Sequence, residues 1–240
     1  MKLGILGYGK MGKTVEQQAL MRGHTVQVLN LNNLSEDLQS SDVQCAIDFS
    51  HADIAMTSIL QCFKAGVSVV SGTTGWNDGV QQVSESAEKH GVAFCWAPNF
   101  SLGMHITFYL NKVLAKIMNT YPEYSPSMLE IHHTQKKDSP SGTAIALAEQ
   151  LISNIDRIKS WKETVAEVTG DVLSIEAKRE EDVKGIHRVS YSGPFDTISL
   201  RHHAISRDGF AAGAVLAAEK LQGMTGNHEF DALLGFGTTK

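Results

Sequence analysis

The sequence predicts an α/β fold in two parts: a Rossmann-type domain with a doubly wound parallel sheet, and an α+β domain with a mixed sheet. Strand-like and helix-like segments alternate up to residue 96, as in βαβ units. A glycine-rich turn, GYGKMG, follows the first strand-like run. After residue 103 the strand-like runs are grouped together. These observations predict one domain that binds a nucleotide and a second domain of different architecture.

The bulk composition excludes several classes of protein. The chain has 240 residues and a formal net charge of -5. This length suffices for two domains with their own cores, and the lack of a basic excess argues against a nucleic-acid partner. Cys45, Cys62 and Cys95 show no CxxC spacing, so neither a disulfide framework nor a zinc site is expected. The first residues match neither a signal peptide nor a membrane span. We therefore expect a cytoplasmic protein that acts on a small molecule and does not bind membranes.

The first apolar run leads into a turn with GxGxxG spacing, followed by a helix at 14–21 and a strand at 25–29. In this context Gly7 allows a tight turn, Gly9 lets the backbone approach a pyrophosphate, and Gly12 lets helix and strand pack closely. Free N–H groups at the start of the helix then face the phosphates. The candidate cofactor-binding residues are Gly7, Tyr8, Gly9, Lys10, Met11 and Gly12.

The acid that normally ends the second strand and holds the ribose hydroxyls is missing, because the chain reads VLNLN there. Asn30 and Asn32 are neutral candidates for binding the ribose, and Lys10 is a candidate for binding a phosphate. The choice between NADH and NADPH therefore stays open.

Three further strands are expected at 43–49, 68–70 and 92–96, with helices at 52–65 and 80–90. Ligands of doubly wound sheets lie outside the carboxyl ends of the strands. A serine, a GTTG turn and an APNF turn follow these strands, which predicts contact with the cofactor; turn chemistry alone is the alternative interpretation. The candidate residues are Ser50, Gly72, Thr73, Thr74, Ala97, Pro98, Asn99 and Phe100.

The middle of the chain is interpreted as a separate substrate domain, because grouped strands favour an antiparallel or mixed sheet with helices on one face. The charged run at 178–182 is interpreted as a solvated loop. Helices are expected at 104–118 and 144–155, and strands at 127–131, 172–177, 187–192 and 197–204.

The stretch EIHHTQKKDSPSGTA, residues 130–144, carries the candidate substrate site. Asp138 or Ser139 can cap a helix whose first turn begins at Pro140. The N–H groups that follow then point outward and attract a carboxylate or phosphate. An ordinary capped helix is the alternative interpretation. The expected donors are Ser141, Gly142 and Thr143.

Two adjacent histidines, His132 and His133, follow a predicted strand. Neighbouring side chains on a strand point to opposite faces, so the pair is a poor metal clamp and no metal is expected. Imidazole titrates near neutrality, which favours a role in proton transfer. Lys136 can supply a fixed positive charge to the substrate, whereas Lys137 is as easily a surface lysine.

The same stretch resembles the E-x-H-H-x-x-K-x-D-x-P-S-G-T-A signature of the 4-hydroxy-tetrahydrodipicolinate reductase family, also called dihydrodipicolinate reductases. The resemblance extends over nearly the whole chain, in matching order. Its further motifs are the GYGKMG turn, Asp48-Phe49-Ser50, the GTTG turn, residues 97–103 (APNFSLG), residues 185–187 (GIH) and residues 206–211 (SRDGFA).

The resemblance implies reduction of 4-hydroxy-tetrahydrodipicolinate, a small dicarboxylate, to tetrahydrodipicolinate by NADH or NADPH, on the diaminopimelate route to lysine. It makes His132 the proton donor and Lys136 its charged partner. It also implies a homotetramer, with residues 1–103 and 211–240 forming the dinucleotide-binding domain and residues 104–210 the substrate-binding and oligomerisation domain. The implied substrate-binding residues are His133, Ser141, Gly142, Thr143 and Arg207.

Departures from the family pattern concern the cofactor: Lys10 stands where the family usually has arginine, the glycine turn is one residue shorter, and the acid after the second strand is missing. Two other functions are alternatives. Another Rossmann oxidoreductase, such as an amino-acid dehydrogenase, leaves the PSGTA helix start unexplained. A non-catalytic nucleotide-sensing module gives no reason for His132 and Lys136.

Overall fold

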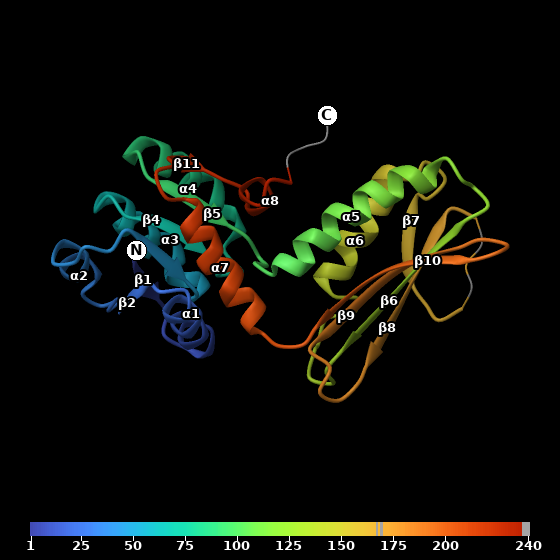
Figure 1. Cartoon of the computed structure of the whole chain (residues 1–240), viewed down its shortest axis with the longest axis horizontal. Helices are drawn as coiled ribbons and strands as arrows, with labels where there is room; N and C mark the ends of the chain where they lie inside the picture. Colours follow the sequence, from blue (N-terminus) through green and yellow to red (C-terminus); the bar gives the residue numbers. More distant parts are fainter. Residues whose placement is uncertain (167, 169, 237–240) are drawn as a thin grey trace. The chain divides into compact units, whose positions relative to one another are not determined.

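The computed structural model describes residues 1–166, 168 and 170–236 and divides them into two compact units (Figure 1). Unit 1 contains the described residues of Met1–Leu102 and Asp208–Lys240, and unit 2 contains those of Gly103–Arg207. Unit 1 is therefore built from both ends of the chain. No helix among the described residues has the length and apolar character needed to span a membrane.

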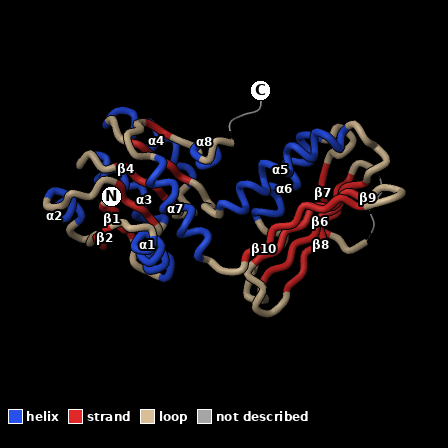
Figure 2. The backbone as a smooth tube through the Cα atoms, viewed as in Figure 1, coloured by secondary structure: helices blue, strands red, loops and turns tan. Residues whose placement is uncertain are grey.

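Unit 1 contains a six-stranded parallel sheet in the order β11-β5-β4-β3-β1-β2. Helices cover both faces, so the predicted doubly wound architecture is confirmed (Figure 2). The strands are β1 (Lys2–Leu6), β2 (Thr25–Val28), β3 (Cys45–Asp48), β4 (Ser68–Ser71), β5 (Ala93–Trp96) and β11 (Gly226–Asn227). The helices are α1 (Lys10–Met21), α2 (Leu34–Gln39), α3 (Ala52–Lys64), α4 (Asn77–His90), α7 (Asp208–Lys220) and α8 (Phe230–Leu233).

Two apolar cores lie on the two faces of this sheet. The first joins Val15 of α1 and Val215 of α7 to the strands, and the second joins Ile59 and Phe63 of α3 to Val83 of α4. The central strand β3 is buried along its whole length, which explains its almost wholly apolar sequence, CAID. All three cysteines are free and buried in these cores.

Unit 2 contains a five-stranded sheet in the order β10-β9-β6-β8-β7. Its pairings are antiparallel for β10·β9 and β9·β6 and parallel for β6·β8 and β8·β7, so the predicted mixed sheet is confirmed. Helices α5 and α6 cover one face (Figure 1). The elements are α5 (Leu102–Asn119), β6 (Ser125–His132), α6 (Gly142–Asn154), β7 (Ser160–Glu163), β8 (Val172–Arg179), β9 (Gly185–Ser192) and β10 (Thr197–Ala204).

Some expected elements differ from the structure. Helix α1 begins at Lys10 rather than residue 14, because Gly9 adopts an extended conformation and serves as its N-cap. Strand β8 runs through Arg179, so the interpretation of residues 178–182 as a solvated loop was wrong for its first two residues. The short elements α2, β7, α8 and β11 and the helix α7 were not predicted.

Helix α7 lies directly against the backbone after β5. A Cβ atom at Gly213 would overlap the carbonyl oxygen of Phe100, whereas one at Gly209 in the same helix meets no heavy atom within 4 Å. Phe100 in turn packs on Phe230, with ring centroids 4.9 Å apart. Gly213 therefore sets how closely the C-terminal part of the chain joins the core of unit 1.

We expect Gly213→Ala to lower the free energy of unfolding by about 1–3 kcal/mol, because the added methyl group forces α7 away from Phe100. Chemical denaturation followed by circular dichroism measures this change. Gly209→Ala is the matched control and should leave stability unchanged or raise it by up to about 1 kcal/mol. Equal stabilities of the two variants would contradict the close contact.

Candidate active site

The glycine turn after β1 has the geometry that a dinucleotide requires. Gly7 has φ +85°, and a Cβ atom there would overlap the backbone of Phe49. A Cβ atom at Gly12 would overlap the carbonyl oxygen of Gly7, while Gly9 faces open space. No side chain among the described residues caps α1. The backbone N–H groups at the start of α1 are therefore available to a phosphate.

The carboxyl ends of β3 and β4 are joined by a buried carboxylate. Asp48 accepts hydrogen bonds from Ser71 Oγ at 2.7 Å and from the backbone N–H of Ser50 at 3.0 Å. The hydroxyl oxygens of Ser50 and Thr73 are both buried and have no hydrogen-bond partner among the described residues. Buried hydroxyl groups normally have a partner. These two lie where the sequence predicts cofactor contacts, so a bound cofactor fits this edge of the sheet.

Two indoles hold the GTTG turn. Trp76 Nε1 and Trp96 Nε1 both donate to the carbonyl oxygen of Thr73, at 2.8 and 2.9 Å. The two rings lie edge to face, with centroids 6.4 Å apart. Both tryptophans were missed by the sequence reasoning. The only available signal was their position next to the predicted GTTG and APNF turns.

The remaining candidates in unit 1 differ in accessibility. Tyr8 is partly exposed and donates a hydrogen bond to Glu16. Asn99 Oδ1 accepts from the backbone N–H of Ser101 at 2.7 Å. Phe100 is 1% exposed and its ring packs inside the core, so only its backbone is placed to contact a cofactor, and its assignment as a cofactor-binding residue stays a prediction. Its apolar ring is better accommodated in the core than at the strand ends. Exposed candidates are Gly9, Lys10, Thr74 and Pro98, and partly buried ones are Met11 and Gly72.

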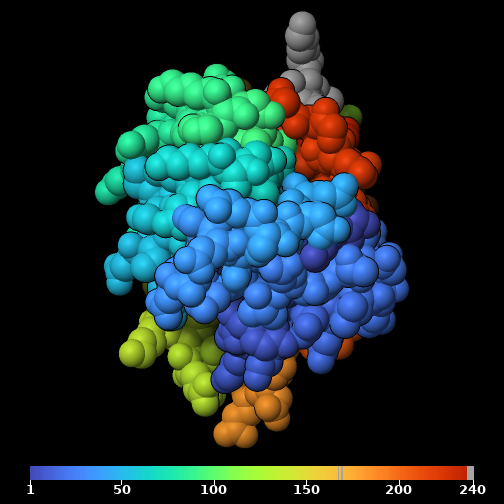
Figure 3. Space-filling view, turned by 90° about the vertical axis from the view of Figure 1, so that its left-hand side faces the viewer, coloured from blue at the N-terminus to red at the C-terminus, as the bar shows by residue number. Residues whose placement is uncertain are grey.

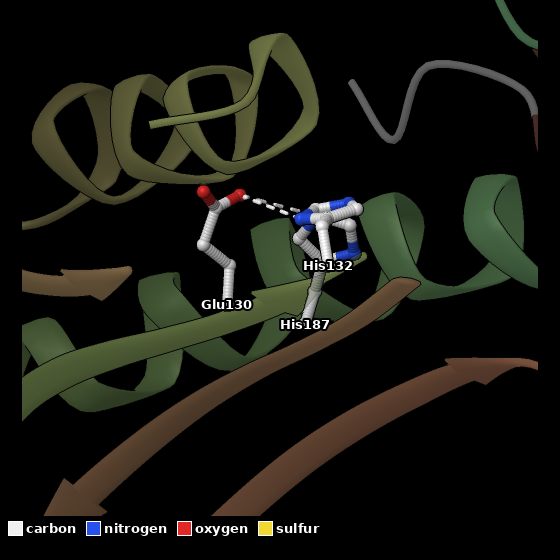
Figure 4. Close-up of side chains that lie close together, drawn as sticks. All are labelled: Glu130, His132 and His187. Atoms are coloured by element: carbon white, nitrogen blue, oxygen red, sulfur yellow. Dashed lines mark ion pairs between the residues drawn. The ribbon is translucent and has the colours of Figure 1, made fainter. Parts of the chain in front are cut away.

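In unit 2 the strands bring a carboxylate and two imidazoles together (Figure 4). Glu130 and His132 are two residues apart on β6, so their side chains share one face of the sheet. His187 lies opposite Glu130 on the antiparallel strand β9. Oε2 of Glu130 is 3.4 Å from His132 Nδ1 and 3.8 Å from His187 Nε2. The imidazole centroids are 5.0 Å apart.

Glu130 is fully buried and its charge is compensated by neighbouring groups. Both of its oxygens lie 3.1 Å from the backbone N–H of Ser141, and Arg179 Nη1 lies 3.4 Å from Oε1. Arg179 also donates to the carbonyl oxygen of Asp138 at 2.6 Å. This arginine was missed by the sequence reasoning, because its contacts join segments more than 40 positions apart.

The start of α6 differs from the prediction in its cap. Ser141, rather than Asp138 or Ser139, is the N-cap: its Oγ accepts from the backbone N–H of Ala144 and lies 3.2 Å from His187 Nε2. Ser141 is 3% exposed, and its N–H is bonded to Glu130. The expectation that this N–H points outward was therefore wrong. Two of the three expected donor positions remain accessible: Gly142 is exposed and Thr143 is partly exposed.

The surroundings of the cluster lower the pKa of both imidazoles. Burial lowers the pKa of His132, although the nearby Glu130 carboxylate acts in the opposite direction. Burial lowers the pKa of His187 to about 3, and the neighbouring His132 and His202 contribute to the decrease. Lowered pKa values agree with the surroundings, because the charge of Glu130 is already compensated by Ser141 and Arg179.

Lys136 lies beside this cluster but is paired within its own loop. Its Nζ is 2.8 Å from Asp138 Oδ1, and this ion pair lowers the pKa of Asp138. His133 and Arg207 line a neighbouring pocket of about 530 Å³, together with Thr134, Gln135, Glu181, Asp182 and Lys184. The structure thus groups the candidates in two sets. His132 and Ser141 gather around Glu130, whereas His133 and Arg207 share this pocket.

Glu130, His132 and His187 also offer three ligand atoms within 4.8 Å of one another, a spacing that a divalent metal can use. The histidine partner of His132 is thus His187 on the adjacent strand, not its sequence neighbour. Glu130 is already held by Ser141 and Arg179, so these contacts explain the cluster without an ion. The expectation of no metal stays a prediction.

Two family models cover almost the entire chain. One, described as dihydrodipicolinate reductase, N-terminus, matches residues 1–100, and the other, dihydrodipicolinate reductase, C-terminus, matches residues 103–234. The chain belongs to the dihydrodipicolinate reductase family. The resemblance inferred from the EIHHTQKKDSPSGTA stretch is thereby confirmed.

Relatives in this family are similar over most of their length. The 4-hydroxy-tetrahydrodipicolinate reductase of Christiangramia forsetii is 45% identical over 228 residues, covering 94% of each chain. That of Archaeoglobus fulgidus is 33% identical, covering 88% of this chain and 90% of the relative. A solved structure, dipicolinate-bound dihydrodipicolinate reductase from Paenisporosarcina sp., has a TM-score of 0.78 at 20% identity and covers 95% of this chain and 97% of its own. This structural similarity shows that the fold is shared.

The neutral state of His187 predicts a pH dependence of stability. Its pKa is about 3 in the folded protein, against 6.5 for a free histidine, so the unfolded chain binds more protons between these values. We expect the free energy of unfolding to fall as the pH is lowered from 6.5, with a contribution from His187 of up to about 1.4 kcal/mol per pH unit. Urea unfolding between pH 5 and pH 7 measures the slope. The slope should be smaller in His187→Asn; equal slopes for both proteins would contradict the neutral buried state.

Proposed function

We propose that this chain is an NAD(P)H-dependent 4-hydroxy-tetrahydrodipicolinate reductase of lysine biosynthesis through diaminopimelate. The proposal rests on the family membership, on relatives that carry this activity in their names, and on one observation in unit 2. That observation is the start of α6 at Gly142 and Thr143, anchored through Ser141 to the same buried Glu130 that approaches His132. Glu130 is therefore in contact with both parts of the proposed site: the helix start that would bind an anion and the histidine that would carry a proton.

Unit 2 is proposed to bind the two carboxylates of the substrate. A helix N-terminus attracts an anion through its N–H groups and its dipole. Gly142 has no neighbouring atom within 4 Å of its Cβ position, so a carboxylate can approach the backbone there. Lys136 is 23% exposed at its side chain and can turn from Asp138 to the substrate. His133 and Arg207 are proposed to bind the substrate from their pocket.

His132 is proposed to deliver the proton. Burial lowers the pKa of His132, whereas the negative charge of a bound dicarboxylate would raise it, so that substrate binding favours the protonated form. Glu130 Oε2 lies 3.4 Å from Nδ1 without forming a hydrogen bond among the described residues, and its carboxylate stabilises the protonated ring electrostatically. A Cβ atom at Gly185 would lie 3.2 Å from Nε2, so the absence of a side chain there leaves room beside this nitrogen. The proton is thus presented from Nε2.

Unit 1 is proposed to hold the cofactor. The glycine turn and the start of α1 are proposed to bind the pyrophosphate. The hydroxyls of Ser50 and Thr73, which have no hydrogen-bond partner in the described part of the chain, are available to the remainder of the cofactor. The bound nicotinamide supplies the hydride. The substrate gains this hydride and one proton and loses its hydroxyl group as water. We further propose that the enzyme is a cytoplasmic homotetramer assembled through unit 2, and size-exclusion chromatography with light scattering tests its oligomeric state.

The decisive experiment follows the absorbance of NADH and NADPH with enzymatically generated substrate. Consumption of reduced cofactor that depends on the dicarboxylate supports the proposal. Consumption with amino-acid products instead would favour an amino-acid dehydrogenase, and binding without consumption would favour a nucleotide sensor.

We expect His132→Asn to lower kcat by roughly a hundred- to ten-thousandfold, because positioned acid catalysis is lost. The affinity for NADH, measured by fluorescence titration, should stay within about twofold of the wild type, since His132 lies in unit 2. Wild-type turnover in this variant would remove His132 from the mechanism.

We expect Lys136→Ala to lower kcat/KM more than His132→Asn does, because both substrate anchoring and charge stabilisation are lost. Steady-state kinetics with varied substrate measures the effect. Lys137→Ala is the matched control, since this neighbouring lysine is exposed, and its kcat/KM should stay close to that of the wild type. Equal losses in both lysine variants would indicate a general effect of charge instead of a specific contact.

A further inference from the structure

No acidic residue follows β2 directly in the sequence, but the fold brings the carboxylate of Asp37 to this position. Asp37 lies in helix α2. Its Oδ2 accepts a hydrogen bond from the backbone N–H of Asn30 at 2.6 Å. Asn30 follows β2, where a Rossmann domain normally carries the acid that binds the ribose hydroxyls. The second oxygen, Oδ1, accepts no hydrogen bond from the described residues. A carboxylate oxygen is therefore left available at the expected ribose position.

The segment around Asp37 contains no positive charge. The sequence has no lysine or arginine between Arg22 and Lys64. The same interval has five acids, Glu36, Asp37, Asp42, Asp48 and Asp53, of which Asp42 pairs with Lys2 from outside the interval. Residues of β2 and α2 lie at the surface of unit 1, in the blue part of Figure 3. A ribose 2′-phosphate placed there would meet a carboxylate and no guanidinium or ammonium group of this segment.

Lys10, in the glycine turn, is the candidate cation that the sequence offers for a phosphate of the cofactor. It is exposed and occupies the first position of α1, where the pyrophosphate is expected. Its charge is therefore matched by the pyrophosphate, which NADH and NADPH share. It does not distinguish the two cofactors.

We propose that Asp37 is the ribose-binding acid of this enzyme, supplied by α2 in place of the missing residue at the end of β2, and that it makes NADH the preferred cofactor. This inference rests on the proposed function. A carboxylate accepts hydrogen bonds from the ribose hydroxyls of NADH and repels the 2′-phosphate of NADPH. Asn30 completes the site through its side-chain amide, whose oxygen already accepts from the backbone N–H of Asn32 at 3.0 Å.

The test is direct binding of NADH and NADPH by isothermal titration calorimetry, without substrate and at low salt. We expect the wild type to bind NADH at least about tenfold more tightly than NADPH. Asp37→Asn keeps a side-chain oxygen for the N–H of Asn30 but removes the charge. It should weaken NADH binding, strengthen NADPH binding and reduce the affinity ratio by roughly tenfold. Raising the salt concentration should narrow the wild-type ratio, because salt screens the repulsion.

Glu36→Gln is the matched control, since it removes an exposed acid from the same short helix, and the affinity ratio should stay within about twofold of the wild type. A second variant, Asn32→Arg, adds a cation without altering Asp37 and should strengthen NADPH binding. Equal wild-type affinities for the two cofactors, or an unchanged ratio in Asp37→Asn, would overturn the inference while leaving the reductase function intact. Failure to bind either nucleotide would overturn both the inference about Asp37 and the proposed reductase function.

Discussion

The arrangement of unit 2 depends on the burial of one carboxylate. An unpaired charge inside a protein costs several kcal/mol, so Glu130 can be buried only where donors surround it. The backbone N–H of Ser141 and the guanidinium of Arg179 meet this requirement. In meeting it they bring together three separate segments: the strand that carries His132, the start of α6, and the end of β8. The arrangement of the proposed anion site is thus a consequence of satisfying a single buried charge.

The structure of unit 1 depends on a different constraint, the close approach of backbone segments. Gly7, Gly12 and Gly213 each stand where a side chain would overlap a neighbouring carbonyl group. The Thr73 carbonyl, held by two indole N–H groups, fixes the GTTG turn independently of any ligand. A turn that is ordered before the cofactor arrives loses little conformational entropy on binding. The two units therefore prepare their sites by different means, close backbone packing in one and charge compensation in the other.

Local patterns in the sequence predicted the features that depend on local geometry. The GxGxxG turn, the strand and helix alternation and the helix beginning near Gly142 could all be recognised because spacing alone determines them. The cap of α6 was assigned wrongly, since the choice of Ser141 depends on Glu130 and His187 from two other strands. Arg179 and the two tryptophans were not recognised for the same reason, because their contacts also depend on how the chain folds. Asp37 could not be recognised either, because its carboxylate reaches the end of β2 only after α2 has folded back.

The discontinuity of unit 1 affects how the protein is made. Its first core includes Ala214, Val215 and Phe230, which follow the whole of unit 2 in the chain. A ribosome releases the amino-terminal strands first, yet their sheet gains α7 and β11 only after the whole of unit 2 has been synthesised. Unit 2, which is continuous, can close its own core earlier. Until α7 and β11 have been made, part of the apolar surface of the nascent amino-terminal segment stays uncovered. Chaperones bind exposed apolar surface of this kind on newly made proteins.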